Sequence, residues 1–516
     1  MIGTRVSRIA AACGGLAMRW LCPCTLIATL ALGACQPEAT VATATAPAFE
    51  AVQPELFSAS GAQPNAWADF DGDGDLDLFV GFRGRADRLY RNDGGTFVDV
   101  AAEFGLGDEE ETRVAAWGDY DGDGWADLYL GFSNTDAPNR LYHNDGGTGF
   151  VDVAEAQGVN LNGTTRQVSW VDYDGDADVD LFIAFRDRPN RLFRNDAGSL
   201  TDVTDETGIG DPRKTVGVVW FDMDRDGDLD VFVANQDGET DGMFRNDGGR
   251  FTDVAAELDM ARPGRAPDQG GVGPSVADYD NDGDFDLFVA TYGPNLLYRN
   301  EGDGRFALVT AEAGLDADYH ATPSVWGDYD NDGWIDLYVG AFMRDNPAER
   351  NYLYRNLAGR FQDVTPANVL EHPASHGVQW MDFDADGDLD LALANNNAEA
   401  GQHRLLRNAL PAAQARRSIA VMVRNAAGLY TVPGAEVRIY RAGTSQLIGT
   451  RLVDTGSGYC SQNIAPLHIG LGKASGNVDI ELIVPRGGMR TPVRLDNVNP
   501  AERAGRPVEI RAPAVP

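Results

Sequence analysis

The chain has 516 residues and a formal net charge of −37, with 79 acidic against 42 basic side chains. A charge this negative argues against nucleic acid or an anionic lipid surface as a partner, because both would repel the protein. The chain offers no disulfide framework, because only Cys460 remains once Cys13, Cys22 and Cys24 leave with the N-terminal leader and Cys35 is modified as argued next.

The N-terminal segment predicts export. An apolar run ends in Leu32-Gly33-Ala34-Cys35, which resembles the lipobox of bacterial lipoproteins, whose cysteine is acylated after signal cleavage. We expect residues 1–34 to be a signal peptide, with Met18 as an alternative start, and residues 35–47 to be a flexible tether. Ordinary cleavage without a lipid is the alternative to acylation of Cys35. The predicted location is a membrane-anchored lipoprotein facing the periplasm or the cell exterior, with a lipid as its only membrane contact.

The chain then repeats an acidic loop seven times, with Asp at positions 1, 3, 5 and 9 and usually Gly at position 6. We call these loops combs 1 to 7; comb 1 reads D-F-D-G-D-G-D-L-D from Asp69 to Asp77. Crowded carboxylates repel one another unless a hard cation lies among them, and calcium takes about six to eight oxygen ligands. The combs are not EF-hand loops, which need Glu at position 12, where comb 1 has Val80.

The sequence therefore predicts up to seven calcium ions, bound by carboxylates at positions 1, 3, 5 and 9 and by the backbone carbonyl at position 7. The predicted ligands are Asp69, Asp71, Asp73, Asp75 and Asp77; Asp119, Asp121, Asp123, Trp125 and Asp127; Asp172, Asp174, Asp176, Asp178 and Asp180; Asp222, Asp224, Asp226, Asp228 and Asp230; Asp278, Asp280, Asp282, Asp284 and Asp286; Asp328, Asp330, Asp332, Trp334 and Asp336; Asp382, Asp384, Asp386, Asp388 and Asp390. Comb 3 has Ala177 at position 6. If that position is left-handed, alanine costs about 1–2 kcal/mol, and the third site is the weakest.

The combs begin 50 to 56 residues apart, and such a period indicates a solenoid, a propeller or an array. Each unit has an apolar stretch, a comb, a strand-like run, a second short strand, a turn such as Asn92-Asp93-Gly94-Gly95 and a last strand. Four strands per unit and seven units predict an all-β, seven-bladed propeller over residues 48–411. A Trp two residues before most combs is expected to pack between blades rather than to stack on a ligand; it is Trp67, Trp117, Trp170, Trp220, Trp326 and Trp380.

The ends of the repeat array predict how the ring closes. The seventh unit stops after Leu405–Asn408 and lacks its final strand, whereas residues 49–56 align with residues 97–104 of the first unit. We therefore expect the N-terminal segment to complete the last blade and to remove an open sheet edge.

The combs and the Phe-rich strands resemble the FG-GAP repeats of integrin α-subunit propellers and of many secreted bacterial proteins. The resemblance covers about residues 48–411. It implies that each comb binds calcium on a hairpin loop at one face of the propeller, through Asp at positions 1, 3, 5 and 9. It also implies that partners dock elsewhere on the molecule.

Residues 412–516 lack combs and contain alternating apolar stretches, which predict a small β-rich domain. Within it, residues 456–463 (G-S-G-Y-C-S-Q-N), followed by residues 467–472 (L-H-I-G-L-G), resemble the signature of the ASPIC/UnbV domain. With the preceding repeats, the chain resembles the cartilage acidic protein family and its bacterial relatives. This resemblance implies a fold and a class of protein but no substrate.

A group of basic residues is expected on the loops that enter the innermost strands, around one mouth of the central channel. The group comprises Arg113, Arg166, Lys214, His320, His372 and His376. These residues could bind an anionic ligand, the three histidines could hold a metal, or the group could neutralise the protein's own acids and cap strands.

The sequence thus predicts an exported, calcium-stabilised binding or adhesion module for a protein or glycan ligand at the cell surface. No catalytic residue is predicted, because the chain has no zinc-binding helix, nucleophile elbow or phosphate loop. The alternative is a surface enzyme, a glycan hydrolase or lyase that uses the cationic mouth. In a third interpretation the calcium loops are structural and the C-terminal domain binds the partner.

Overall fold

The computed structural model describes residues 47–107, 109–342, 350–370, 375–397, 402–503 and 505–514. The predicted signal peptide, Cys35, nearly all of the tether and His372 lie outside the described residues. The chain is nearly all β, with 45% strand and 5% helix. Within the described ranges, no helix is long and apolar enough to cross a membrane. The α-helices have four residues each: α1 (Ala154–Gln157), α2 (Thr204–Thr207), α3 (Thr310–Ala313), α4 (Ala367–Leu370) and α5 (Ala412–Ala415).

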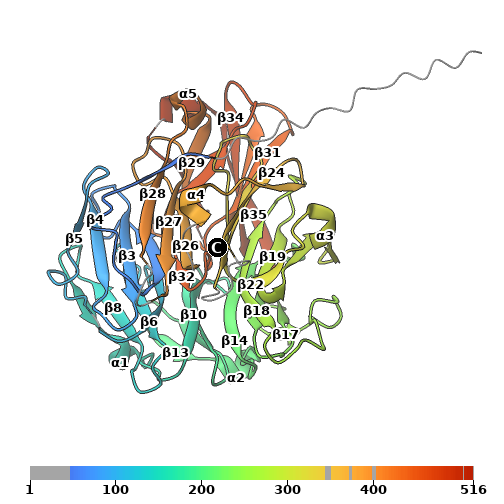
Figure 1. Ribbon diagram of the computed structural model, residues 1–516. Helices are drawn as coiled ribbons and strands as arrows, with labels where there is room; N and C mark the ends of the chain where they lie inside the picture. The colour runs from blue at the N-terminus through green and yellow to red at the C-terminus, as the bar shows by residue number, and fades with distance from the viewer. Residues whose placement is uncertain are drawn as a thin grey trace, which may run out of the picture. The chain divides into compact units, whose positions relative to one another are not determined.

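Each repeat unit contributes four antiparallel strands, with the comb joining the first strand to the second (Figure 1). The strands of units 5 and 6 are joined into one eight-stranded sheet, and a strand from the C-terminal part of the chain adds a fifth to the sheet of unit 2. Units 1 to 3 contain β2 (Ala62–Ala68), β3 (Asp77–Phe82), β4 (Arg88–Asn92) and β5 (Phe97–Asp99); β6 (Thr112–Gly118), β7 (Asp127–Phe132), β8 (Arg140–Asn144) and β9 (Phe150–Asp152); β10 (Thr165–Val171), β11 (Asp180–Phe185), β12 (Arg191–Asn195) and β13 (Leu200–Asp202). Units 4 and 5 contain β14 (Thr215–Phe221), β15 (Asp230–Asn235), β16 (Gly242–Asn246) and β17 (Phe251–Asp253); β18 (Gly270–Ala277), β19 (Asp286–Pro294), β20 (Leu296–Asn300) and β21 (Phe306–Leu308). Units 6 and 7 contain β22 (Asp318–Gly327), β23 (Asp336–Ala341), β24 (Tyr352–Asn356) and β25 (Phe361–Asp363); β26 (Ser375–Met381), β27 (Asp390–Asn395), β28 (Arg404–Asn408) and β1 (Phe49–Ala51).

The first strands of the units form a closed ring. Strands β2, β6, β10, β14, β18, β22 and β26 contact one another in this order, and β26 contacts β2. Because every first strand runs into a comb, all the combs lie at the same end of the ring and share one face. The outermost strands have only three residues each, which keeps the exposed sheet edges short.

The N-terminal segment closes the ring, as the sequence predicts. Strand β1 pairs antiparallel with β28, with Phe49 opposite Asn408. The Val52 N–H donates to the Leu405 carbonyl at 2.9 Å, and the Phe49 ring lies 6.1 Å from that of Trp380. The last sheet is therefore built from both ends of the propeller sequence.

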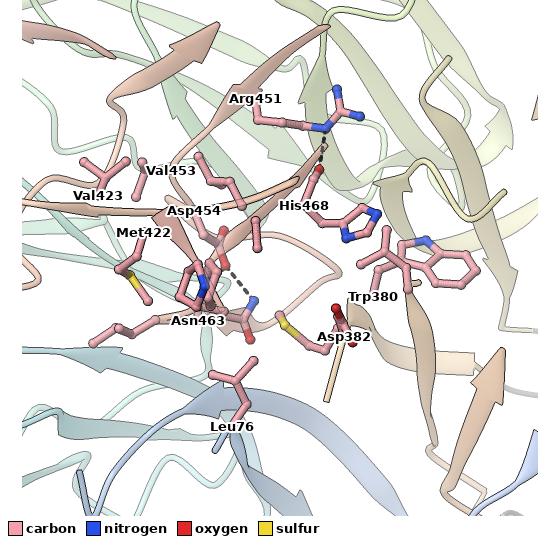
Figure 2. Close-up of a pocket in the computed structure, with 18 of the residues that line it drawn as sticks. Leu76, Trp380, Asp382, Met422, Val423, Arg451, Val453, Asp454, Asn463 and His468 are labelled. Carbon is pink, nitrogen blue, oxygen red and sulfur yellow. Dashed lines mark hydrogen bonds between the residues drawn. The ribbon is translucent and has the colours of Figure 1, made fainter. Parts of the chain in front are cut away.

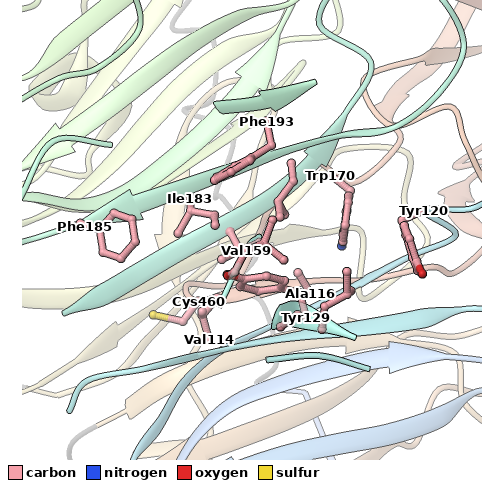
Figure 3. Close-up of a cluster of buried hydrophobic side chains, with 14 of the residues drawn as sticks. Val114, Ala116, Tyr120, Tyr129, Val159, Trp170, Ile183, Phe185, Phe193 and Cys460 are labelled. Carbon is pink, nitrogen blue, oxygen red and sulfur yellow. The ribbon is translucent and has the colours of Figure 1, made fainter. Parts of the chain in front are cut away.

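The recurrent tryptophans pack between neighbouring units, which confirms the packing interpretation. Trp67, Trp170 and Trp220 are fully buried. The Trp170 ring of unit 3 stacks on Tyr120 of comb 2 at 6.2 Å between centroids, and the two rings lie in one cluster of buried side chains (Figure 3).

The strands after residue 412 form two sheets around a separate apolar core, and we call this part the C-terminal domain. One sheet comprises β33 (Leu467–Gly470), β29 (Ser418–Arg424) and β36 (Val508–Arg511). The other comprises β31 (Leu447–Leu452), β30 (Glu436–Arg441), β34 (Val478–Arg486) and β35 (Met489–Val498). The predicted linker before this domain contains α5, and a 3₁₀ helix η1 (Pro500–Arg503) precedes β36.

Candidate functional site: the combs and the domain that covers them

Each comb closes on itself through two backbone amides. The carboxylate at position 1 accepts a hydrogen bond from the N–H at position 6 in all seven combs, for example from Gly74 to Asp69 at 3.1 Å. The carboxylate at position 5 accepts from the N–H at position 7, for example from Asp75 to Asp73 at 2.8 Å. These bonds hold the loop in a tight turn.

Position 6 is left-handed in every comb. The six glycines there have φ between 90° and 97°, and Ala177 has φ 81°. L-residues with a Cβ rarely adopt this conformation, so the alanine in comb 3 is strained. The structural condition for a weaker third site is therefore met, while the affinity itself stays a prediction.

The Asp at position 9 has a structural role that the ligand pattern does not reveal. Asp77 accepts the Phe70 N–H at 3.1 Å and the Asn92 N–H at 2.8 Å, which ties the start of the comb to the end of the third strand. Burial raises the pKa of Asp77 to about 8 and that of Asp127 to about 9. This position can therefore offer a cation only the lone pairs that the backbone leaves free.

A ring of asparagines links neighbouring combs, and the sequence analysis missed it. In every unit the Asn that ends the third strand donates through its side chain to the position-2 carbonyl of the preceding comb. Asn144, for example, reaches Phe70 at 2.9 Å, and Asn92 reaches Phe383 of comb 7 at 2.9 Å. The remaining donors are Asn195, Asn246, Asn300, Asn356 and Asn408. Their recurrence before the hairpin turn is the available sequence signal, and we assigned it to the turn alone.

Several comb carboxylates have a buried oxygen with no hydrogen-bond partner within the described residues; they include Asp119, Asp174, Asp222, Asp280 and Asp384. Leaving a buried charge unpaired is costly, so these oxygens fit a bound cation. The carboxylates at positions 1, 3 and 5 of combs 1 and 2 offer atoms within 4.8 Å of one another, as do those at positions 1, 3 and 9 of combs 3 and 4. Burial raises the pKa of Asp119 to about 6 and that of Asp222 to about 7, and a cation would favour the ionised form of both.

The C-terminal domain covers the comb face, and two of its arginine side chains pair with carboxylates of two combs. Arg486 Nε lies 3.1 Å from Asp172 Oδ2 in comb 3. Arg490 Nη1 lies 2.6 Å from Asp222 Oδ2 in comb 4, and its Nη2 lies 2.6 Å from Glu436 Oε1. All three of these carboxylate side chains are less than a tenth exposed. Positions 1 of combs 3 and 4 are thus neutralised from within the chain.

Other combs meet the domain through weaker contacts. Buried Arg451 places its charge near Asp278 and Asp328, the first residues of combs 5 and 6, and burial lowers the pKa of this arginine. Ala415 of α5 accepts from the Asn331 side chain at 3.1 Å, so the predicted linker is packed on comb 6. At comb 2, the neighbouring side chain from the domain is the apolar Leu429.

Residues 454–464 of the domain, which we call the plug, enter the ring of first strands. Strand β32 (Ser461–Gln462) of the plug pairs parallel with β6. Gln462 bonds the Trp170 backbone N–H at 2.7 Å and carbonyl at 2.9 Å. Further bonds join the plug to the backbones of Trp67, Trp220 and Val378. Residues 456–463, the first part of the predicted ASPIC/UnbV signature, therefore lie in the segment that enters the ring, and Cys460 belongs to the buried cluster of units 2 and 3 (Figure 3). The second part, residues 467–472, contains β33 of the C-terminal domain.

The plug also covers part of the predicted cationic mouth. Arg113 is 8% exposed and donates to the Gln63 side chain at 2.6 Å and to the Tyr459 hydroxyl at 3.0 Å. His376 is fully buried, with its ring 4.9 Å from that of Tyr459. Burial lowers the pKa of His376 well below its usual range, and the charges of Arg113 and Arg166 lower it further. The structure thus brings Arg113, Arg166 and His376 together.

The other described mouth residues make different contacts. The Lys214 ammonium lies 2.9 Å from Asp237, an acid of its own unit, as the neutralising interpretation expects. The His320 ring lies 4.8 Å from that of Tyr292 and pairs in register with it across β19 and β22.

A cavity of about 720 Å³ lies between the comb face and the C-terminal domain, within the range of small-molecule pockets. Trp380 and Asp382 border it from the propeller, and Met422 borders it from the domain (Figure 2). The polar groups on its wall bond to one another: Arg451 Nε donates to the His468 carbonyl at 3.1 Å, and Asn463 donates to Asp454 at 2.6 Å. Trp380 therefore belongs both to the propeller core and to the wall of this cavity.

Comparisons with known proteins agree with this architecture. Residues 69–339 match FG-GAP-like repeats in five overlapping segments, and residues 425–500 match the ASPIC and UnbV family. Cartilage acidic protein 1 of Mus musculus is 26% identical over 273 residues, which is 48% of this chain and 38% of the relative. The protein of the same name from Homo sapiens is 26% identical over 298 residues, 46% of this chain and 43% of the relative. The matched region spans about two fifths of the length of these relatives.

Two of the solved structures that the chain matches both have TM-scores below 0.5. One is an Agrocybe aegerita lectin described as recognising non-reducing terminal N-acetylglucosamine, with 19% identity, a TM-score of 0.39 and coverage of 66% of this chain and 87% of the lectin chain. The other is BBS1N in complex with ARL6DN, with 11% identity, a TM-score of 0.44 and coverage of 71% of this chain and 99% of that chain. The family matches themselves cover more than half of the 516 residues. The chain belongs to the FG-GAP-like repeat family and carries an ASPIC and UnbV domain after its repeats.

Proposed function

We propose that this protein is an exported, calcium-stabilised binding or adhesion module that presents a propeller and a docked C-terminal domain to a protein or glycan ligand at the cell surface. FG-GAP-like repeats followed by an ASPIC and UnbV domain suggest a module of this type. The net charge of −37 supports a partner other than nucleic acid. The lipobox-like Leu32-Gly33-Ala34-Cys35 supports a lipid anchor.

The observation that carries the calcium proposal is the repeated geometry of the combs. All seven close through the same two amide bonds, and combs 2 to 7 hold buried carboxylate oxygens with no hydrogen-bond partner in the described residues. Oxygen ligands at positions 1, 3, 5 and 9, with the carbonyl at position 7, suit calcium, which tolerates irregular coordination better than magnesium does. The ion would neutralise carboxylates and fix the loops between the first and second strands.

We also propose which surfaces bind the partner. The C-terminal domain covers the comb face, and the plug fills the ring, so we assign ligand binding to the outer face of the domain and to the propeller face opposite the combs. Strand β35 presents exposed side chains along its length, including Met489, which is 56% exposed.

The calcium proposal is tested by counting ions. Native mass spectrometry and calorimetric titration of the metal-free chain should show several calcium ions per chain and weaker binding of magnesium. Uptake of no calcium would refute the proposal. The binding proposal is tested on glycan arrays and cell-envelope extracts with and without EDTA. Saturable binding without product supports a binding module, whereas turnover of a polymer supports the glycan-enzyme alternative.

A further inference from the structure

Comb 2 differs from the other combs in the side chain that precedes the linking asparagine. In six units this residue is an arginine: Arg91, Arg194, Arg245, Arg299, Arg355 and Arg407. In unit 2 it is His143. Guanidinium groups cannot act as metal ligands at neutral pH, whereas a neutral imidazole has a lone pair and is the commonest protein ligand of transition metals.

The histidine faces its comb. His143 Nδ1 lies 3.1 Å from Asp121 Oδ2 at position 3 and 3.3 Å from Asp127 Oδ1 at position 9. The corresponding arginines of units 1, 3, 4 and 5 pair instead with an acid two residues further on, as Arg91 does with Asp93. In units 6 and 7 the arginine does face its comb, with Arg355 2.7 Å from Asp330 and Arg407 2.8 Å from Asp384, but a guanidinium has no lone pair to offer a metal ion. The imidazole of His143 is turned toward carboxylates that a cation could share with it.

The separations match those of a small coordination sphere. An ion with tetrahedral bonds of about 2.0–2.1 Å places its ligands roughly 3.3 Å apart. The ligand atoms of Asp121, Asp127 and His143 lie within 4.8 Å of one another. A fourth donor is at hand, because Asp119 is 1% exposed, shares a second such group with Asp121, and its Oδ1 has no hydrogen-bond partner within the described residues. This buried, unpartnered oxygen points to a ligand independently of the histidine.

We propose that comb 2 is a mixed imidazole and carboxylate site for a divalent transition ion of the zinc class, bound by His143, Asp121 and Asp127 with Asp119 as the fourth ligand. Imidazole favours zinc, cobalt and nickel, whereas the all-oxygen combs favour hard ions such as calcium. The proposal rests on the proposed function only in treating a comb as a cation-binding loop. Comb 2 thereby becomes selective for a different metal from that of its neighbours.

The test uses cobalt as a visible probe of zinc sites in the full chain, with millimolar calcium present throughout. Wild-type protein should bind one Co²⁺ that zinc displaces, and His143→Arg, which restores the residue of the other units, should weaken this binding at least tenfold. His143→Gln keeps a polar side chain of similar size and should lose the ion as well. Arg91→His is the matched gain-of-binding variant, because Arg91 is the counterpart of His143 in unit 1. It places an imidazole over comb 1 beside Asp71 and Asp77 and should create a second cobalt site.

Equal cobalt affinity and stoichiometry in the wild type and in both His143 variants would overturn the proposal and leave His143 as an ion-pair partner of Asp121. Thermal melting of each variant in calcium establishes that the fold is intact. Calcium titration of the same samples separates the two proposals. If cobalt binding depends on His143, the mixed site is supported even when the protein binds no calcium. If the protein binds calcium but its cobalt binding does not depend on His143, only the proposed function is supported.

Discussion

Combs 2 and 4 share one sequence pattern and differ in what surrounds their carboxylates. In both, the position-1 Asp is buried, bonds the amide at position 6 through Oδ2 and has an unpartnered Oδ1 within the described residues. At comb 4 the Arg490 guanidinium lies 2.6 Å from Asp222. At comb 2 no arginine of the described C-terminal domain pairs with Asp119. The same loop can therefore be neutralised by an external ion or by a second domain, and dependence on calcium should vary around the ring.

Removal of calcium with EDTA should have the largest effect. A site at a hundredfold excess of ligand over its dissociation constant contributes about 2.7 kcal/mol, and several such sites rival the stability of a whole domain. We expect the melting temperature to fall by tens of degrees, with poor rescue by magnesium. Hydrogen exchange should rise more in combs 1 and 2 than in combs 3 and 4, which keep their arginines. A fall in melting temperature of only a few degrees would contradict a large stabilisation by calcium. An equal rise in hydrogen exchange in all four combs would show that they do not differ in their dependence on calcium.

Arg490→Gln should have the next largest effect. The substitution leaves Asp222 and Glu436 buried without their shared cation, and breaking a buried pair from one side costs about 3–5 kcal/mol. The matched control on the same strand is Arg494→Gln, whose side chain is 40% exposed and pairs with Asp479, so its loss should cost less than about 1 kcal/mol. Urea unfolding in calcium measures both changes in the free energy of unfolding. Similar losses for the two variants would show that Arg490 does not neutralise comb 4.

Substitution of the two position-1 aspartates should give effects of opposite sign in EDTA. Asp119→Asn removes a buried charge that no cation neutralises and keeps an oxygen for the Gly124 N–H, so it should raise the free energy of unfolding by about 1 kcal/mol. Asp222→Asn deprives Arg490 of one of its two carboxylates and should lower it by about 1–3 kcal/mol. When each comb has its own metal ion bound, both variants should be destabilised, because each loses a ligand. Two effects of the same sign in EDTA would contradict the comparison on which they rest.

Much of the propeller could be predicted because its signals are local and repeated. Residues within a single unit are enough to predict its comb, the strand that follows the comb and the buried tryptophan that precedes it. The closing pair of Phe49 and Asn408 could be predicted across more than 350 positions, since one unit lacks a strand that another segment supplies. The left-handed backbone at Ala177 could be inferred from the glycines that occupy the same position elsewhere.

The contacts between the two domains could not be predicted in this way. Gln462 bonds Trp170 and Arg490 bonds Asp222, and neither segment of the C-terminal domain has a periodic partner that would reveal the pairing. The sequence predicts Arg113 among the basic residues of the mouth, but it does not predict that Tyr459 of the plug contacts and buries this arginine. The structural role of the position-9 Asp could not be predicted, because its carboxylate accepts hydrogen bonds from backbone N–H groups. A pattern of side chains in the sequence does not reveal such bonds.

The smallest expected effect concerns comb 3, whose carboxylate at position 1 has an arginine but whose loop is strained. Ala177→Gly removes the Cβ from a residue with φ 81° without changing a ligand. Relief of about 1–2 kcal/mol, less roughly 0.4–1 kcal/mol from the greater freedom of glycine in the unfolded chain, should leave a gain of about 0.5–1 kcal/mol. A metal-free loop can relax out of this conformation and a loaded loop cannot, so calcium binding at comb 3 should tighten up to about tenfold. Ala197→Gly, with φ 52° in the hairpin turn of the same unit, is the control and should shift melting without changing calcium affinity. Calorimetric titration beside the wild type measures both, and an unchanged affinity in Ala177→Gly would show that strain at position 6 does not limit the third site.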